Sequence, residues 1–284
     1  YHPDVDIPET IIATTDPQEA LQSAEIVVLA VPAQSLRANL MDWAPWIGDE
    51  AVYVSLIKGI ELGTSMRMSE VIAEVTGADP QRIAVVSGPN LAKEIIARQP
   101  TATTVAASTQ ASAVAIQQAC TTDYFRPYWT TDVIGTEIGG AVKNVIAVAN
   151  GIAVGMGLGE NSQSSLITRG LAEIGRLGVA LGADPLTFLG LAGVGDLVAT
   201  CQSPLSRNRT FGENLGRGLS VEETIAVTNQ TCEAFKSCQP ILELAQKLGV
   251  EMPITAEVVE VLHFDKPPRD LLSSFMARDT KSEL

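Results

Sequence analysis

Glu25-Ile-Val-Val-Leu-Ala-Val31, which ends at Pro32, is the stretch of sequence that decides the fold. A short apolar run without polar alternation is typical of a strand that is buried on both faces of a parallel sheet. Just before it, Asp16 and Pro17 predict the start of a helix, because aspartate caps helix N-termini and proline suits the first helical position. A predicted helix therefore leads into this buried strand.

The same alternation of helix and strand continues along the chain as far as about Thr136. Pro127 indicates an edge strand around it, because proline cannot donate a hydrogen bond to a neighbouring strand. Strands that alternate with helices favour an α/β fold with a parallel, doubly wound sheet. The pattern predicts further strands at residues 51–57, 83–86, 101–107 and 125–129, and helices at residues 64–76 and 111–120.

Strand signals stop after Thr136, and only helical patterns follow. We therefore expect two domains, a sheet domain over residues 1–136 and an all-helical domain over residues 137–284, with the active cleft between them. Residues 141–159 are strongly apolar, but polar side chains such as Lys143 interrupt them, which indicates a buried helix rather than a membrane span. Helices are predicted at residues 137–154, 162–181, 221–226, 237–248 and 254–262.

The composition narrows the classes of protein that fit the chain. Of its 284 residues, 46% are hydrophobic and 18% are charged, which supports a large core. A net charge of −14 disfavours binding to nucleic acid. The four cysteines form no Cys-x-x-Cys pair and the chain has only two histidines. We therefore expect reduced thiols, no metal site, and acid–base chemistry carried by Lys, Asp or Glu.

Two segments place polar groups where predicted strands end. Lys58 follows one strand, and a Gly88-Pro-Asn90 turn follows the next. Ligands bind at this edge of doubly wound sheets, and Asn90, as the N-cap of a following helix, would mark a helix N-terminus that attracts anions. The alternatives are a solvated surface lysine and an ordinary turn between a strand and a helix.

Lys143 is the single charged residue in a long run of small and apolar residues, Ile138 to Asn150. Burial would lower the pKa of this lysine toward the range of a general base. Asn150 lies seven residues further on, and so on the same face of the predicted helix. The alternative is a lysine whose stem is buried and whose charge reaches the surface.

Asp196 follows a glycine-rich turn, and Ser206-Arg207-Asn208-Arg209 gathers positive charge in an otherwise acidic chain. An arginine guanidinium matches the geometry of phosphate oxygens, whereas the alternative here is a salt-bridged loop. Together the segments place one lysine, one aspartate, an arginine–asparagine pair and two strand-end loops at one cleft. This set of groups suits a small phosphorylated hydroxy or keto compound better than the substrate of a hydrolase.

The motifs, taken together, resemble those of the bacterial-type NAD(P)-dependent glycerol-3-phosphate dehydrogenases. The resemblance runs from Tyr1 to a family-like segment at Met276–Lys281, and it implies a Rossmann-type sheet domain followed by a helical domain. Five motifs stand in the family's order: Ser55-Leu-Ile-Lys-Gly-Ile60, Ser87-Gly-Pro-Asn-Leu-Ala-Lys-Glu94, Ala141-Val-Lys-Asn-Val-Ile-Ala147, Gly193-Val-Gly-Asp-Leu-Val-Ala-Thr-Cys201 and Ser206-Arg-Asn-Arg209.

The resemblance implies an oxidoreductase that interconverts sn-glycerol 3-phosphate and dihydroxyacetone phosphate with NAD or NADP. Lys143 matches the proton acceptor, Lys58 a second active-site lysine that contacts substrate and cofactor, and Asp196 the carboxylate that orients the catalytic lysine. It also implies a cytoplasmic homodimer that links glycolysis to phospholipid synthesis. Further substrate contacts match Gly88, Asn90, Ser206, Arg207 and Asn208, and further cofactor contacts match Ala92, Arg207, Thr231 and Glu233.

The sequence departs from the family pattern at two places. Nothing before Glu25 has the strand, Gly-x-Gly-x-x-Gly turn and helix that cradle the pyrophosphate, so we expect the first βαβ unit to be missing and this chain alone to be inactive. Ala234 follows Glu233 where the family has glycine, which matters only if the backbone there needs a positive φ. Two rivals remain: a related 3-hydroxyacid or 6-phosphogluconate dehydrogenase, and a non-catalytic truncated remnant.

Overall fold

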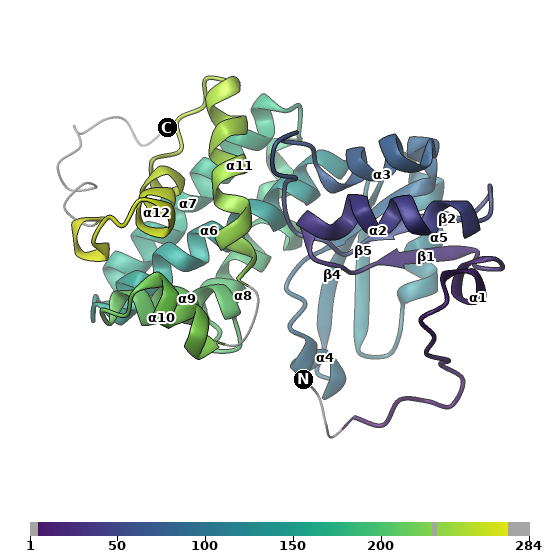
Figure 1. Ribbon diagram of the computed structural model, residues 1–284, viewed down its shortest axis with the longest axis horizontal. Helices are drawn as coiled ribbons and strands as arrows, with labels where there is room; N and C mark the ends of the chain where they lie inside the picture. Colours follow the sequence, from purple (N-terminus) through teal and green to yellow (C-terminus); the bar gives the residue numbers. More distant parts are fainter. Residues whose placement is uncertain (1–4, 229–231, 272–284) are drawn as a thin grey trace.

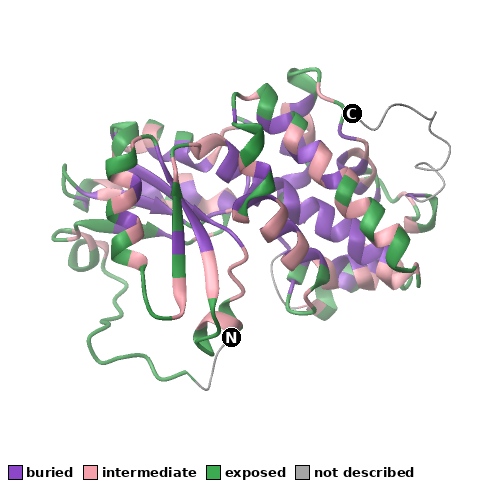
Figure 2. Ribbon diagram, turned by 180° about the vertical axis from the view of Figure 1, so that it is seen from behind, coloured by how far each residue is buried: buried purple, intermediate pink, exposed green. Residues whose placement is uncertain are grey.

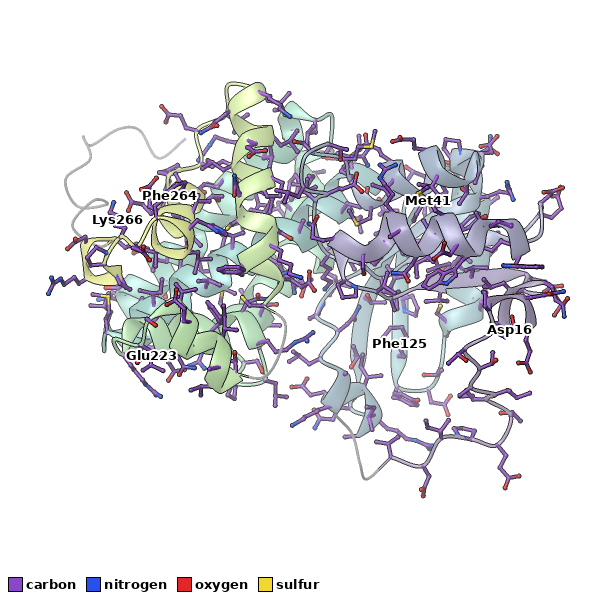
Figure 3. All side chains as sticks on the ribbon, viewed as in Figure 1. Asp16, Met41, Phe125, Glu223, Phe264 and Lys266 are labelled. Atoms are coloured by element: carbon purple, nitrogen blue, oxygen red, sulfur yellow. The ribbon has the colours of Figure 1, made fainter. Side chains whose placement is uncertain are left out.

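The computed structural model describes residues 5–228 and 232–271. These residues form a sheet half (residues 5–132) and a helical half (residues 133–271) that lie side by side (Figure 1). Asp16 lies at the outer edge of the sheet half, and Glu223, Phe264 and Lys266 lie on the far side of the helical half (Figure 3). The two halves follow one another along the chain, so the last strand leads directly into the first long helix.

All five predicted strands form, and they make one sheet with the order β1-β2-β3-β4-β5. The expected parallel arrangement is wrong for one of the four pairs, because β4 runs antiparallel to β3. Between β3 and β4 the chain forms one short helix, α4 (Ala92–Ile96). Pro127 lies in β5 at the edge of the sheet, as predicted. The strands are β1 (Ile26–Leu29), β2 (Val52–Ser55), β3 (Ile83–Ser87), β4 (Thr101–Ala107) and β5 (Phe125–Thr130).

Local hydrogen bonds set the helix boundaries in the sheet half. Asp16 caps the first helix, its side chain accepting from the backbone N–H of Gln18 at 2.9 Å. The helix predicted at residues 64–76 begins only at Met68, where the Glu70 carboxylate accepts from the backbone N–H of the N-cap residue Arg67. The helices are α1 (Pro17–Leu21), α2 (Leu36–Trp43), α3 (Met68–Thr76), α4 (Ala92–Ile96) and α5 (Gln110–Cys120).

One long helix, α6, forms the core of the helical half. It is long and apolar enough to cross a membrane, but 89% of its most apolar window is buried inside the protein, and the buried residues of this half concentrate around it (Figure 2). The predicted domain boundary at residue 136 falls near the start of α6. The helices are α6 (Val133–Gly155), α7 (Glu160–Ala180), α8 (Asp196–Gln202), α9 (Arg207–Gly216), α10 (Val221–Thr228), α11 (Glu233–Lys247) and α12 (Pro253–His263).

Glycines let the backbones of α6 and α9 touch. A Cβ on Gly151 of α6 would collide with the carbonyl oxygen of Arg209, and a Cβ on Gly212 of α9 would collide with that of Val148. One helical turn further along, a Cβ on Gly155 or on Gly216 would likewise collide with a backbone carbonyl oxygen of the other helix. These glycines therefore let α9 pack closely against the second half of α6.

Side-chain contacts join the two halves on the side of α3. The buried carboxylate of Glu137, on α6, accepts hydrogen bonds from Arg67 at 2.7 Å and from the Ser69 hydroxyl at 2.6 Å. Lys247, at the end of α11, donates to the hydroxyl of Ser65 at 3.0 Å. These contacts hold the start of α3 against the helical half.

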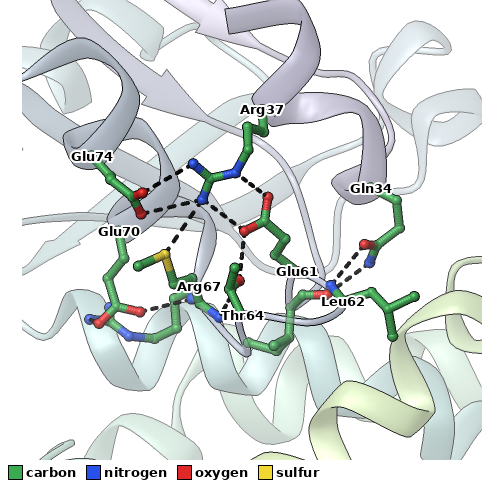
Figure 4. A network of polar contacts seen from close by, with 10 residues as sticks. Gln34, Arg37, Glu61, Leu62, Thr64, Arg67, Glu70 and Glu74 are labelled. Atoms are coloured by element: carbon green, nitrogen blue, oxygen red, sulfur yellow. Dashed lines mark hydrogen bonds and ion pairs between the residues drawn. The ribbon is translucent and has the colours of Figure 1, made fainter. Parts of the chain in front are cut away.

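A second polar network holds the segment that follows Lys58 (Figure 4). Arg37 of α2 donates to Glu61 at 2.9 Å and to Glu74 at 3.3 Å. The side chain of Gln34 donates to the backbone carbonyl of Ile60 at 2.8 Å. Because Ile60 is also packed into the core of the helical half, this loop connects both halves directly behind Lys58.

Candidate active site

A cavity of about 1230 Å³ lies between the two halves. The sheet half lines it with residues 30–32 and 56–58, which follow β1 and β2, and with residues 90–93. The helical half lines it with α6, α8, α9 and the start of α11. The cavity therefore sits at the carboxyl ends of strands, where ligands bind in open α/β sheets.

Lys143 is buried at this cavity, as the sequence predicts. Its ammonium group forms an ion pair with the Asp196 carboxylate and donates a hydrogen bond to the Thr200 hydroxyl at 2.6 Å. Burial, together with the positive charge of Lys58, lowers the pKa of Lys143 to about 7, although Asp196 acts in the opposite direction. Lys143 can therefore take up or release a proton near neutral pH.

Lys58 reaches the same carboxylate from the sheet half. Its ammonium nitrogen lies 2.6 Å from the second oxygen of Asp196 and 3.0 Å from the carbonyl oxygen of Gly88. The carboxylate of Asp196 thus binds both lysines, one on each oxygen. The side chain of Lys58 passes over Gly140 of α6, where a Cβ would meet its stem at 3.4 Å. Three residues that are far apart in sequence therefore meet at one point.

No role was predicted for Thr200, which lies in the motif from Gly193 to Cys201. Thr200 stands four residues after Asp196 in α8, on the same helix face, and its hydroxyl also lies 3.3 Å from the Asp196 carboxylate. This i, i+4 spacing was the available signal. Asn150 shares the face of Lys143 as predicted and donates to the backbone carbonyl of Cys201 at 3.0 Å, so it ties α6 to α8.

The turn after β3 differs from the prediction in one respect. Leu91, and not Asn90, is the N-cap residue of α4. The Asn90 side chain instead donates to the Thr103 hydroxyl of β4 at 2.9 Å, because β4 returns antiparallel beside β3. Asn90 and Ala92 line the cavity, whereas Gly88 contributes its carbonyl oxygen to Lys58. Gly88 has a φ of 152°, and a Cβ there would meet Thr103 at 2.9 Å.

The Ser206–Arg209 segment is the beginning of α9 and not a loop. The Ser206 hydroxyl is its N-cap and accepts from the backbone N–H of Arg209 at 3.3 Å. Arg207 lies exposed on the cavity wall. Arg209 instead pairs with Glu213 at 3.1 Å, so of the two arginines Arg207 is the one that faces the cavity.

Asn208 joins three elements through its amide group. The amide nitrogen donates to Asn144 of α6 at 3.0 Å, and the amide oxygen accepts from the backbone N–H of Ala234 at 3.2 Å and from the Cys232 thiol at 3.2 Å. Ala234 lies inside α11 and is absent from the positive-φ residues, so the replacement of glycine there costs the backbone nothing.

Glu233 is the first residue of α11 and lines the cavity. Its partial burial raises its pKa, against the opposite effect of the positive charge of Arg207. Thr231 and the Met276–Lys281 segment lie outside the described residues. Among residues 5–228 and 232–271, no cluster of His, Cys, Asp or Glu could hold a metal ion, and burial raises the pKa of the Cys201, Cys232 and Cys238 thiols to about 12.

The cavity suits a nicotinamide nucleotide together with a small substrate. Its volume exceeds the usual range of roughly 300–1,000 Å³ for a single small ligand. The buried side-chain oxygen of Asn90 has no hydrogen-bond partner within the described parts of the chain. The sheet, the cavity at its strand ends and the buried lysine of the helical half together define a two-domain, nicotinamide-dependent dehydrogenase.

Comparisons with known proteins specify the family. Sequence profiles of the N-terminal and C-terminal domains of NAD-dependent glycerol-3-phosphate dehydrogenase match residues 1–113 and 132–273. The chain therefore belongs to the NAD-dependent glycerol-3-phosphate dehydrogenase family, as the resemblance of its motifs predicts. The family's sheet domain binds NAD or NADP.

Individual relatives agree with this assignment. Glycerol-3-phosphate dehydrogenase (NAD(P)+) of Streptomyces avermitilis is 60% identical over 283 residues, which are 100% of this chain and 84% of that protein. The enzyme of the same name from Corynebacterium glutamicum is 58% identical over 284 residues, or 100% of this chain and 86% of that protein. The crystal structure of glycerol-3-phosphate dehydrogenase from Coxiella burnetii superposes with a TM-score of 0.93 at 36% identity, over 97% of this chain and 84% of that one.

Proposed function

We propose that the cavity interconverts sn-glycerol 3-phosphate and dihydroxyacetone phosphate, with Lys143 as the group that moves the proton. In the oxidising direction the C2–H bond breaks and its hydride leaves the substrate, while Lys143 takes the proton of the C2 hydroxyl. The nicotinamide, when bound, accepts that hydride, and it supplies one in the reverse reaction. The observation that carries the proposal is the single Asp196 carboxylate that binds Lys143 and Lys58 at the cavity.

The environment of Lys143 supports this role in both directions. A pKa of about 7 leaves the neutral amine available as a base and the ammonium form available as an acid near neutral pH. Asp196 and Thr200 fix the position of the amine, so it need not reorganise when the proton moves. Lys58 places a positive charge beside the oxygen on which negative charge develops.

Other residues bind the remaining parts of the ligands. Arg207 is exposed on the cavity wall and suits the substrate phosphate, because its guanidinium matches two phosphate oxygens. Ser206 and Asn208 hold the first turn of α9 and so set the position of Arg207. Asn90 and Gly88 belong to the substrate site. Ala92, Glu233 and Lys58 line the part of the cavity assigned to the cofactor.

Family membership supports three further proposals, which concern the metabolic role, the location and the oligomeric state of the protein. The product glycerol 3-phosphate would supply phospholipid synthesis, with the enzyme in the cytoplasm and acting as a homodimer. We also propose a division into a cofactor domain (residues 1–136) and a helical substrate domain (residues 137–284), in which the cavity between the halves receives one ligand from each side.

The test follows the absorbance of NADH and of NADPH after addition of dihydroxyacetone phosphate. It uses the chain as given and the same chain preceded by a family-type βαβ unit. Cofactor oxidation that depends on dihydroxyacetone phosphate in either chain supports the proposal, and the two rates give the cofactor preference. Absence of turnover in both folded chains would contradict it and favour a related hydroxyacid dehydrogenase or a non-catalytic remnant.

A further inference from the structure

Thr103 stands behind the cavity, beside Gly88, and its side chain forms a hydrogen bond with the candidate site residue Asn90. It is fully buried in β4, at the point where β4 passes beside the end of β3. Its hydroxyl lies 3.1 Å from the backbone carbonyl oxygen of Ser87 and 2.9 Å from the amide nitrogen of Asn90.

These two contacts determine which way the Asn90 amide faces. A hydroxyl has one hydrogen, and the carbonyl oxygen of Ser87 can only accept, so the Thr103 hydroxyl donates to Ser87. Its lone pair is then left to accept from Asn90, which must present its NH2 group to Thr103. The side-chain oxygen of Asn90 consequently faces away from β4. That oxygen is buried and has no hydrogen-bond partner within the described residues.

We propose that Thr103 is a positioning residue that fixes Asn90 as a hydrogen-bond acceptor for the C1 hydroxyl of the substrate. This inference rests on the proposed function, because it needs a three-carbon phosphate substrate beside Lys58 and Lys143. In dihydroxyacetone phosphate at neutral pH, the phosphate oxygens and the ketone oxygen accept hydrogen bonds, and the C1 hydroxyl is the donor. A buried acceptor without a partner therefore selects the hydroxymethyl end of the substrate and not its phosphate.

The neighbouring contacts agree with this orientation of the substrate. Lys58 donates to the carbonyl oxygen of Gly88, two residues before Asn90, so the turn that carries the acceptor also carries a contact of the lysine pair. Arg207 approaches the cavity from α9 in the other half. The phosphate would then lie toward the helical half and the hydroxymethyl group toward the turn after β3.

The test compares two substrates in the wild-type enzyme and in Thr103→Val and Thr103→Ser. One substrate is dihydroxyacetone phosphate, and the other is acetonyl phosphate, in which a methyl group replaces the hydroxymethyl group. With NADH as reductant, we expect Thr103→Val to lower kcat/KM for dihydroxyacetone phosphate roughly tenfold, the factor that one hydrogen bond is worth, and to leave acetonyl phosphate nearly unchanged. Thr103→Ser keeps the hydroxyl and should keep the preference.

Other outcomes would overturn the inference. An equal fall for both substrates would show a purely structural role for Thr103, and a change in the KM for NADH alone would mean that Asn90 binds the nicotinamide amide. If Thr103→Val does not fold, as thermal unfolding would reveal, Thr103→Ala gives the same comparison with less steric demand beside Gly88. Wild-type enzyme that leaves dihydroxyacetone phosphate unreduced would instead defeat the proposed function itself.

Discussion

The two halves of the molecule contribute to the cavity in different ways. The helical half supplies Lys143 of α6 and Asp196 of α8, which are 5% and 1% exposed and are joined by an ion pair. The sheet half supplies Lys58 and Asn90, which are partly exposed and stand on turns after strands. Burial lowers the pKa of Lys143 and so prepares it for proton transfer, whereas partly exposed turns can contact ligands as they enter. The comparison indicates that the chemistry belongs to the helical half and much of the ligand contact to the sheet half.

The largest expected effect is the loss of the buried lysine. Lys143→Ala removes the proton donor and acceptor, so we expect kcat to fall roughly 10²–10⁴-fold, the usual range for a general acid or base. NADH binding, followed by fluorescence titration, should stay close to that of the wild type. Lys236→Ala is the matched control, because Lys236 is an exposed lysine of α11. Turnover of Lys143→Ala at the control's level would remove Lys143 from the mechanism.

A second change tests whether the rigidity of the helical half matters. In Gly151→Ala the new Cβ collides with the carbonyl oxygen of Arg209 and pushes α9 away from α6. We expect a loss of about 1–3 kcal/mol in the free energy of unfolding, the usual cost of overpacking, and a raised KM for dihydroxyacetone phosphate as Arg207 shifts. Chemical denaturation and steady-state kinetics measure the two effects.

Gly175→Ala is the control for that experiment. Gly175 also lies in a long helix, α7, but a Cβ there meets nothing within 4 Å. Alanine is a better helix former than glycine, so this variant should gain about 0.5–1 kcal/mol and keep its KM. Equal destabilisation of both variants would show that glycine is needed in these helices for some reason other than the contact between α6 and α9.

The smallest expected effect concerns the influence of the sheet half on the helical half. Lys58 is a positive charge that lowers the pKa of Lys143. Lys58→Met removes this charge, so the pKa of Lys143 should rise and the pH midpoint of its activity should move upward. The pH dependence of kcat/KM measures the shift. An unchanged or lower midpoint would show that the charge of Lys58 does not lower the pKa of Lys143.

Much of the fold follows from the sequence because apolar runs and their spacing determine strands and helices locally. All five strands form where the runs stand, and Lys143 lies on a buried helix as its apolar surroundings predict. The predicted direction of β4 was wrong, because a continuous apolar run indicates a buried strand without showing whether it runs parallel or antiparallel to its neighbour. Helix α9 was missed because it begins with polar residues and packs through glycines, which hydrophobic patterns do not detect.

The geometry of the site cannot be predicted from local sequence patterns, because its residues are far apart in the chain. Asp196 is 53 residues from Lys143 and 138 residues from Lys58. Local patterns could therefore identify each of them as a candidate site residue but could not show that they meet. Only the packing of α8 against α6, together with the reach of Lys58 from the end of β2, brings the three together. The Asn90 side chain was misplaced because its partner, Thr103, comes from a strand whose direction the sequence did not reveal.

The most direct test of the central claim is the pH dependence of kcat/KM in both directions. Reduction of dihydroxyacetone phosphate needs protonated Lys143, so its rate should be constant at low pH and fall as the pH rises through about 7. Oxidation of glycerol 3-phosphate needs neutral Lys143, so its rate should rise through the same pH and then level off. Opposite profiles with a common midpoint near 7 would support Lys143 as the proton carrier, and profiles that run in the same direction, or without a break there, would contradict it.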